Sequence, residues 1–141
     1  MQLRNSTADG ASLSIGQCAT LACLLEASSP KPGNVHRGAD FEDMTFTDFA
    51  VSAAAIAPAL DSAVHGVGAA VLAAVQATRR LVPVNTNLGT VLLLAPLAAV
   101  PRSQRLKAGI REVLCRLTTS DAEAVYEAIR LAEPGGLGSA D

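Results

Sequence analysis

The chain of 141 residues is half hydrophobic and has 11 basic and 13 acidic residues, so its formal net charge at pH 7 is −2. That hydrophobic content excludes a disordered polar chain, and the length suits one domain with its own core. Without a surplus of basic residues, and with only three phenylalanines and one tyrosine, the chain is not typical of proteins that bind nucleic acid polymers, whereas a nucleotide-sized ligand stays open.

The composition predicts an all-α fold. Alanine and leucine dominate and tryptophan is absent, which suits close-packed helices better than a β-sandwich. We expect a bundle of about six helices, some kinked by proline, over residues 12–141. Residues 1–11 are expected to be a disordered polar lead, because they lack the apolar core of a signal peptide.

The cysteines and the most apolar stretch of the sequence indicate in which cellular compartment the protein is expected. Cys18, Cys23 and Cys115 are odd in number and lack the spacing of a zinc site, which predicts reduced thiols in a cytoplasmic protein. The stretch from Leu81 to Pro101 is interrupted by polar residues and prolines, so its apolar part is too short to span a bilayer of about 30 Å. A buried helix is expected there, and no membrane partner.

The first predicted helix begins after Ser12 or Ser14 and runs to about Ala27. One face of it carries apolar residues at helical spacing and is predicted to be core: Cys18, Leu21, Ala22 and Leu25. Glu26 follows in the last turn, where a carboxylate opposes the helix dipole. That position is consistent with a functional carboxylate, and a solvated surface glutamate is an equally good reading.

The next stretch, from Glu26 to Asp40, is predicted to be an active-site loop. It concentrates polar side chains within a largely apolar chain: Lys31, Asn34, His36, Arg37 and Asp40. Pro30 and Pro32 stiffen the backbone, which lowers the entropic cost of placing such groups.

A second helix is predicted from Phe46 to about His65. Thr45 and Asp48 fit a capping box, and Pro58 in the interior should kink the helix or split it in two. His65 fits a cation at a helix C-terminus better than a catalytic base. Asp61, if it faces inward, needs a partner such as Lys31, Arg37 or a metal ion.

A third helix, from Gly68 to Leu81, leads into a polar turn that feeds a hydrophobic helix ended by Pro101. Asn87 is the predicted N-cap of that helix. The free amides of its first turn, with the Asn85 amide and the Thr86 hydroxyl, would make an anion site. The simpler alternative, one capping asparagine among ordinary turn residues, leaves the rest of the polar patch unexplained.

Two further helices are predicted. Ser103 caps one that runs through Ile110, Val113, Leu114 and Leu117, and its basic residues are expected on a solvated face: Arg102, Arg105, Lys107, Arg111 and Arg116. Ser120 and Glu123 fit a capping box that opens the last helix, and Glu133 to Gly138 breaks it. Because a glycine-rich turn usually connects elements, the chain is expected to be cut there.

Several ordered motifs resemble the triphosphoribosyl-dephospho-CoA synthase family. They are Glu26 with Lys31-Pro-Gly-Asn-Val-His36, Asp40-Phe41, Thr45-Phe-Thr-Asp-Phe49, Asn85-Thr-Asn-Leu-Gly89, Val125-Tyr-Glu-Ala-Ile-Arg-Leu-Ala132 and Pro134-Gly-Gly-Leu-Gly138. The resemblance extends from about Ile15 to the last residue and covers the N-terminal half of an all-helical family domain. It implies that the chain is a fragment or a truncated reading frame.

The resemblance implies the transfer of the 5-triphosphoribosyl group of ATP to the 2'-hydroxyl of 3'-dephospho-CoA, with release of adenine. Glu26, His36 and Asp40 are then candidate catalytic residues. The candidate substrate-binding residues are Lys31, Gly33, Asn34, Arg37, Asn85, Thr86 and Asn87. ATP is implied as a substrate and Mg²⁺ as a cofactor, with Asp43 and Asp61 as candidate ligands.

One departure leaves the acceptor open. Members that serve citrate lyase and malonate decarboxylase resemble KPG-Leu-Val-Asp, whereas this chain has Asn34-Val-His-Arg37 after the glycine and Asn87 where a histidine is favoured. Two alternatives therefore stand: a related ribosyl-phosphate transferase with another acceptor, or an inactive truncated chain that binds a nucleotide. An incomplete bundle would expose apolar faces such as Val91 to Leu97, and would associate with itself or with a partner that supplies the missing half.

Overall fold

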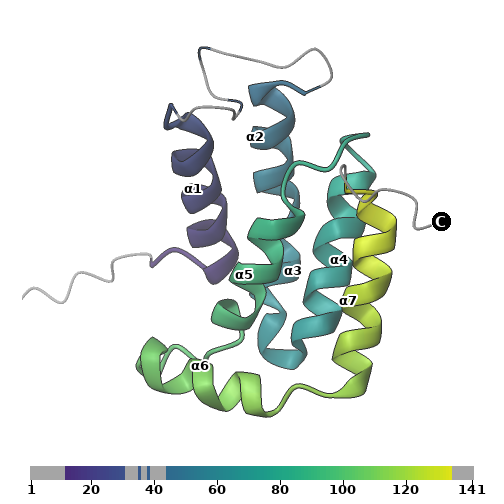
Figure 1. Ribbon diagram of the computed structural model, residues 1–141. Coiled ribbons are helices and arrows are strands. Elements are labelled where there is room, and N and C mark those ends of the chain that lie inside the picture. Colours follow the sequence, from purple (N-terminus) through teal and green to yellow (C-terminus); the bar gives the residue numbers. More distant parts are fainter. Residues whose placement is uncertain (1–11, 31–34, 36–37, 39–43, 135–141) are drawn as a thin grey trace, which may run out of the picture.

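The fold is a bundle of helices joined by short turns (Figure 1), in a computed structural model that describes residues 12–30, 35, 38 and 44–134. In chain order the helices are α1 (Ile15–Ser28), α2 (Phe46–Ala55), α3 (Ala57–Asp61), the 3-10 helix η1 (Ala63–His65), α4 (Val67–Arg79), α5 (Leu88–Ala98), α6 (Leu106–Cys115) and α7 (Thr119–Ala132). No strand occurs among the described residues, and the predicted all-α class is confirmed.

Capping boxes begin three of these helices. Ser14 pairs with Gln17 at α1 and Thr45 with Asp48 at α2, as the sequence predicts for Thr45, and each pair satisfies two backbone amides. The last helix begins earlier than predicted, because its capping box is Thr118 with Asp121 and not Ser120 with Glu123. The prediction that Ser103 caps α6 is also wrong, since α6 begins at Leu106 after Arg105.

The predicted split at Pro58 is confirmed. Helix α2 ends at Ala55, and Pro58 occupies the first turn of α3, where the missing amide proton costs no helical hydrogen bond. Ile56 joins the two helices in an α-helical conformation and is completely buried, so the break bends the chain without exposing it. This break gives the bundle one more helix than the predicted count of about six.

Two helices receive a carboxylate from a distant helix at a glycine in their first turn. Asp61 of α3 accepts hydrogen bonds from the Gly16 amide at 2.7 Å and from Ser14 Oγ at 3.0 Å. Asp121 of α7 accepts one from the Gly68 amide at 2.9 Å. A Cβ atom at either glycine would collide with the backbone of the helix that supplies the carboxylate. The collision is at Ala57 for Gly16 and at Asp121 for Gly68. Glycine therefore permits both close approaches.

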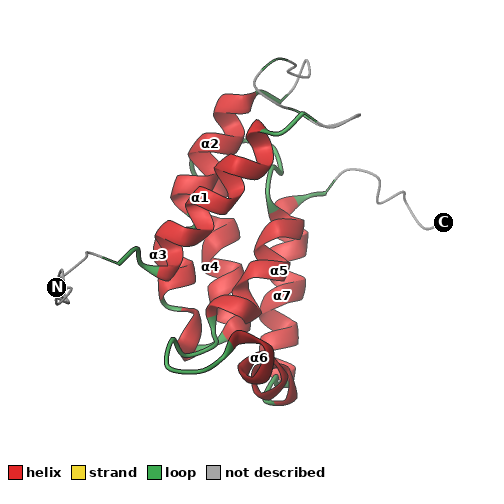
Figure 2. Cartoon of the chain, turned by 90° about the vertical axis from the view of Figure 1, so that its left-hand side faces the viewer, coloured by secondary structure: helices red, strands yellow, loops and turns green. Residues whose placement is uncertain are grey.

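Helices α4 and α7 run parallel and side by side (Figure 1). Gly68 contacts Asp121 where both helices begin, and Arg79 binds the Glu133 carboxylate at 3.2 Å where both end. Arg79 also donates to the Pro83 carbonyl and so ties the α4–α5 turn to α7. Helix α6 lies across the opposite end of the bundle, where Arg102 donates to the Leu13 carbonyl beside the start of α1 (Figure 2).

The core consists mainly of alanine and valine from α3, α4, α5 and α7. The predicted core face of α1 is wrong: Cys18, Leu21, Ala22 and Leu25 are exposed, and Gly16, Ala19 and Ala27 are buried instead. Leu114 and Leu117 are exposed, and the basic residues of this segment are solvated as expected.

An apolar groove runs between α1 and α5. Its lining is Ile15, Cys18, Ala19, Ala22, Leu94, Leu97, Ala98 and Leu106. Leu93 and Leu97 on α5 are 72% and 37% exposed, whereas Val91 and Ala95 of the same helix are completely buried. Within the part of the chain that the structure describes, no helix has the length and hydropathy needed to cross a membrane.

Asp121 is expected to make stability depend on acid pH. Its hydrogen bonds from the Gly68 amide, the Thr118 amide and the Thr118 hydroxyl hold the pKa of its carboxyl below the ordinary value. The ionised form is bound better in the folded state, so the stabilisation is complete above the unfolded pKa near 4 and is lost as pH falls through the lower, folded pKa. At pH 7 we expect Asp121→Asn to lower the free energy of unfolding by about 1 kcal/mol, because both caps weaken.

Chemical denaturation at pH 7 and at pH 2.5 measures this effect. The difference between wild type and Asp121→Asn should shrink at the lower pH, because the wild-type carboxyl takes up a proton as the pH falls through its folded pKa. Glu123→Gln, at an exposed position of the same helix, is the matched control and should change little at either pH. A difference for Asp121→Asn that is the same at both pH values would contradict the assignment.

Candidate functional site

The two polar segments singled out in the sequence adjoin, along the chain, helix ends that lie in the same half of the bundle, where α1 ends and α2 and α5 begin (Figures 1 and 2). The first is the chain between α1 and α2, in which the described residue Val35 is completely buried. The second is the turn from Asn85 to Asn87. Hydrogen bonds join this turn to α2 and α4. The bundle thus brings the helix ends that flank the predicted active-site loop to the same region as the predicted anion-binding turn.

A buried polar network holds the turn in place. Ser52 of α2, Thr78 of α4 and Asn87 are the buried polar side chains of the described part, and they are linked. The Asn87 amide donates to the Ser52 carbonyl at 3.4 Å and to Thr78 Oγ1 at 3.3 Å. Because a buried polar group is costly when left unsatisfied, this network specifies one position for the turn.

The predicted cap of α5 is corrected by this network. Asn87 stands at the N-cap position, but its side chain makes no capping hydrogen bond because it turns inward to α2 and α4. Asn85 supplies the cap, since its side-chain oxygen accepts from the Leu88 amide at 3.1 Å. The Asn85 amide nitrogen keeps its two protons for other partners.

Glu26 lies in the last turn of α1, as predicted, and is exposed. Helix α1 is joined to α2 by a hydrogen bond from Thr20 Oγ1 to the Ala53 carbonyl. Glu26 lies six residues beyond Thr20, which is about 9 Å along the helix axis. Burial raises the pKa of the neighbouring Cys23 thiol, and the charge of Glu26 adds to the rise. Cys23 therefore stays protonated at neutral pH and is a poor nucleophile.

Asp61 lies apart from these residues. Its carboxylate binds Gly16, ten residues before Glu26 on α1, so the two carboxylates are separated by about 15 Å along the helix axis. The partners that the structure gives Asp61 are Ser14 and Gly16. It is exposed rather than turned inward.

The remaining predicted site residues lie outside the described residues: Lys31, Gly33, Asn34, His36, Arg37, Asp40 and Asp43. In the part that is described, no group of three or more His, Cys, Asp or Glu side chains is placed to hold a metal ion.

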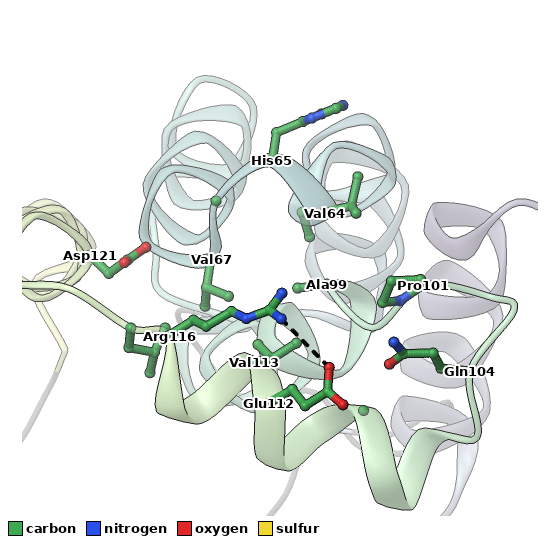
Figure 3. A pocket seen from close by; sticks show the side chains of 14 residues that line it. Val64, His65, Val67, Ala99, Pro101, Gln104, Glu112, Val113, Arg116 and Asp121 are labelled. Carbon is green, nitrogen blue, oxygen red and sulfur yellow. Dashed lines mark ion pairs between the residues drawn. The ribbon is translucent and has the colours of Figure 1, made fainter.

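A hollow of about 310 Å³ lies at the opposite end of the bundle, between α6 and the turn from η1 into α4 (Figure 3). Arg116 pairs with Glu112, one helical turn earlier on the α6 side of the hollow, at 3.8 Å, and Asp121 is engaged with Gly68 and Thr118. His65, at the C-terminus of η1 as predicted for that residue, points away from α6. None of the predicted site residues that the structure describes lines this hollow.

The comparison with known families decides the assignment. A family model described as ATP:dephospho-CoA triphosphoribosyl transferase matches residues 12–141. The chain belongs to this family. No curated protein and no solved structure matches the chain.

The match to the ATP:dephospho-CoA triphosphoribosyl transferase family confirms the predicted resemblance and makes the chain a transferase-family enzyme. At the level of the family, the substrates are ATP and dephospho-CoA. The matched range includes both polar segments and the network that fixes the second.

Sequence reasoning missed two residues of that network, Ser52 and Thr78. The available signal was weak: each is a small polar residue in a mostly apolar helix, and such residues also occur on solvated faces. Only the tertiary contacts show that both side chains are buried around Asn87.

Proposed function

We propose that this chain transfers the 5-triphosphoribosyl group of ATP to the 2'-hydroxyl of 3'-dephospho-CoA and releases adenine. The observation that carries the proposal is the family match over residues 12–141, which includes the active-site loop and the Asn85–Asn87 turn. The helix ends that flank the loop lie in the same half of the bundle as the Asn85–Asn87 turn, which supports a shared site.

The reaction breaks the bond between C1' of the ATP ribose and adenine, and forms a bond between C1' and the acceptor oxygen. The proton of the acceptor hydroxyl is removed, and adenine leaves with a proton. Positive charge develops on the ribose in the transition state. The site must therefore hold the triphosphate, protonate the leaving base and orient the acceptor hydroxyl.

The phosphate-binding role is proposed for Lys31 and Arg37, whose cations form charge-assisted hydrogen bonds to phosphate oxygens. Asn34 and the close backbone approach that Gly33 permits belong to the same loop. In the described part, the Asn85 amide and the start of α5 add hydrogen-bond donors that suit an anion.

The acid and base roles are proposed for Glu26, His36 and Asp40. Proton transfer in such a step needs side chains that can exchange a proton near neutral pH, and carboxylates and imidazole are the usual groups. The exposed position of Glu26 in the last turn of α1 leaves it accessible to a substrate from solvent.

Mg²⁺ is proposed to bind together with the triphosphate. In nucleotide sites this ion is held by one or two carboxylates together with phosphate oxygens, so a cluster of three protein ligands is not required. Asp43, near the start of α2, remains the proposed ligand. Asp61 fits this role less well, because its carboxylate already binds the first turn of α1.

Adenine release tests the proposal. Purified protein is incubated with ATP and Mg²⁺, with and without 3'-dephospho-CoA. Released adenine is measured by chromatography, and the nucleotide product is identified from its mass by mass spectrometry. We expect adenine to form only with the acceptor, in equal amount to a triphosphoribosyl adduct.

Other outcomes point to the alternatives. Adenine release with a different ribosylated cofactor precursor, and none with dephospho-CoA, would identify a related transferase. Folded protein that binds ATP but releases no adenine with any acceptor would identify a nucleotide-binding chain without activity.

A further inference from the structure

The outer face of α1 is an apolar stripe. Four residues form it at the i, i+3, i+4 and i+7 spacing of a helix–helix contact, and all are exposed: Cys18, Leu21, Ala22 and Leu25. Leu21 is 47% exposed and Leu25 is 61% exposed. Helix α1 lies at the front of the bundle in Figure 2, and no other described segment covers this α1 stripe. It therefore has the pattern of a packed helix face without a partner.

An apolar groove continues the α1 stripe toward α5. Cys18 and Ala22 line it from α1, and Leu94 and Leu97 line it from α5. The two helices together contain one charged residue, Glu26. Single exposed leucines are ordinary on a protein surface, whereas a contiguous uncharged area across two helices is typical of an interaction surface.

The charge pattern does not suit a membrane as the occupant. Helices that bind at a lipid surface carry Lys and Arg beside their apolar face, and neither α1 nor α5 has a basic residue. A strongly charged partner finds no set of opposite charges on these helices either. The surface suits another uncharged, apolar helix.

The α1 stripe is complementary to itself. In a two-fold symmetric dimer the same surface patch of both copies forms the interface. A two-fold axis perpendicular to α1, placed between Leu21 and Ala22, makes the two copies of the helix antiparallel. Each Cys18 is then level with Leu25 of the second copy, so a small side chain lies opposite a large one. Leu21 meets Leu21 on one side of the helix pair. Ala22 meets Ala22 on the side of the groove, where the short side chains permit a close approach.

The antiparallel arrangement also separates the charges. Glu26 of one copy is level with Gln17 of the other, nine residues from the second Glu26. That spacing is about 14 Å along the helix axis, which exceeds the screening length of about 8 Å at physiological ionic strength. In a parallel pair the two carboxylates would lie at the same level and repel each other. Charge therefore favours the arrangement in which the small and large residues alternate.

We propose that the α1 stripe is a dimer interface, in which it packs antiparallel against the same stripe of a second copy of this chain, with the apolar groove at the edge of the contact. The face of α1 that the sequence predicts to be core is then the core of the interface. This inference rests on the surface of α1 and α5 alone and is independent of the proposed function.

Sedimentation equilibrium of the full chain tests the dimer. We expect a species of twice the monomer mass of 14.4 kDa. Leu21→Lys should shift the protein to the monomer, because two ammonium groups would face each other across the axis. Leu114→Lys is the matched control, since Leu114 is 51% exposed on α6, and it should leave the dimer intact.

Oxidation of Ala22→Cys tests the position of the axis. Cysteines at this position would face each other within reach of a disulfide, so a covalent dimer is expected on non-reducing electrophoresis. The Cys18 thiols of the wild type would lie seven residues, or about 10 Å, apart along the axis, and should not be linked. Ala73→Cys, at an exposed position of α4, controls for random collision.

A wild type that is monomeric at every soluble concentration would overturn the inference. If Leu21→Lys then lowers the melting temperature, a segment of the same chain covers the α1 stripe; if it does not, the occupant is a different protein. A dimer that persists in Leu21→Lys uses another face and would also contradict the proposal. Should Leu21→Lys fail to fold, the oxidation decides, because cross-linking of Ala22→Cys no greater than that of Ala73→Cys rejects the antiparallel α1 contact.

Discussion

Replacing Gly68 with alanine is expected to lower the free energy of unfolding by about 1 to 3 kcal/mol, and by more if α7 cannot move. A Cβ atom at this position would lie 2.5 Å from the Cα atom of Asp121 and 2.6 Å from its carbonyl oxygen. Both are backbone atoms, so no change of side-chain rotamer relieves the overlap. Separating the helices would also lengthen the hydrogen bond from the Gly68 amide to the Asp121 carboxylate.

Urea denaturation of Gly68→Ala and of Gly89→Ala, as the matched control, measures the effect. Nothing lies within 4 Å of a Cβ atom at Gly89, in the first turn of α5. Alanine loses less backbone entropy than glycine on entering a helix, so Gly89→Ala should leave stability unchanged or raise it slightly. Equal destabilisation by both substitutions would show that helix propensity, and not the contact with α7, governs Gly68.

Replacing Lys31 with alanine or Glu26 with glutamine is expected to reduce adenine release by about 100-fold or more. Lys31→Ala removes a proposed cation from the triphosphate, and Glu26→Gln removes a proposed proton-transfer group while keeping its shape. The rate is followed as adenine released from ATP in the presence of 3'-dephospho-CoA.

Lys107→Ala and Glu123→Gln are the controls, because both residues are exposed on helices away from the proposed site. Each variant should unfold at nearly the wild-type temperature. Unchanged adenine release in both Lys31→Ala and Glu26→Gln would remove the two residues from the catalytic site, whatever the family match implies.

Local sequence rules predicted the features that depend on a few neighbouring residues. Thr45 and Asp48 are three residues apart, so their reciprocal bonds form whenever a helix begins there. Pro58 lacks an amide proton, and that chemistry favours a helix break near this position. The family resemblance likewise depended on motifs in a fixed order, which can be recognised in the sequence without knowing how the helices pack.

The buried face of α1 could not be predicted because this helix is apolar on every side, and helical periodicity then distinguishes no face. The small residues Gly16 and Ala19 turn inward, where α3 approaches closely, and the larger Leu25 is left outside. Residue volume at a close contact outweighs hydrophobicity there.

The start of α7 shows a similar limit. Both Thr118 with Asp121 and Ser120 with Glu123 have capping-box spacing, and local rules do not separate them. A tertiary contact favours the first pair, because Asp121 also accepts from the Gly68 amide. The roles of Ser52 and Thr78 were hidden for the same reason, since both depend on contacts with the distant residues Thr86 and Asn87.

The two caps supplied from other helices have a consequence for the order of folding. Gly16 and Gly68 receive their carboxylates from residues 45 and 53 positions further along the chain. The entropy of closing those long loops must be lost before either bond forms, so the first turns of α1 and α4 are completed late, when α3 and α7 dock. The exchange rate of the Gly68 amide proton should therefore report on the docking of α7, and these helix starts should open together with their partner helices rather than fray alone.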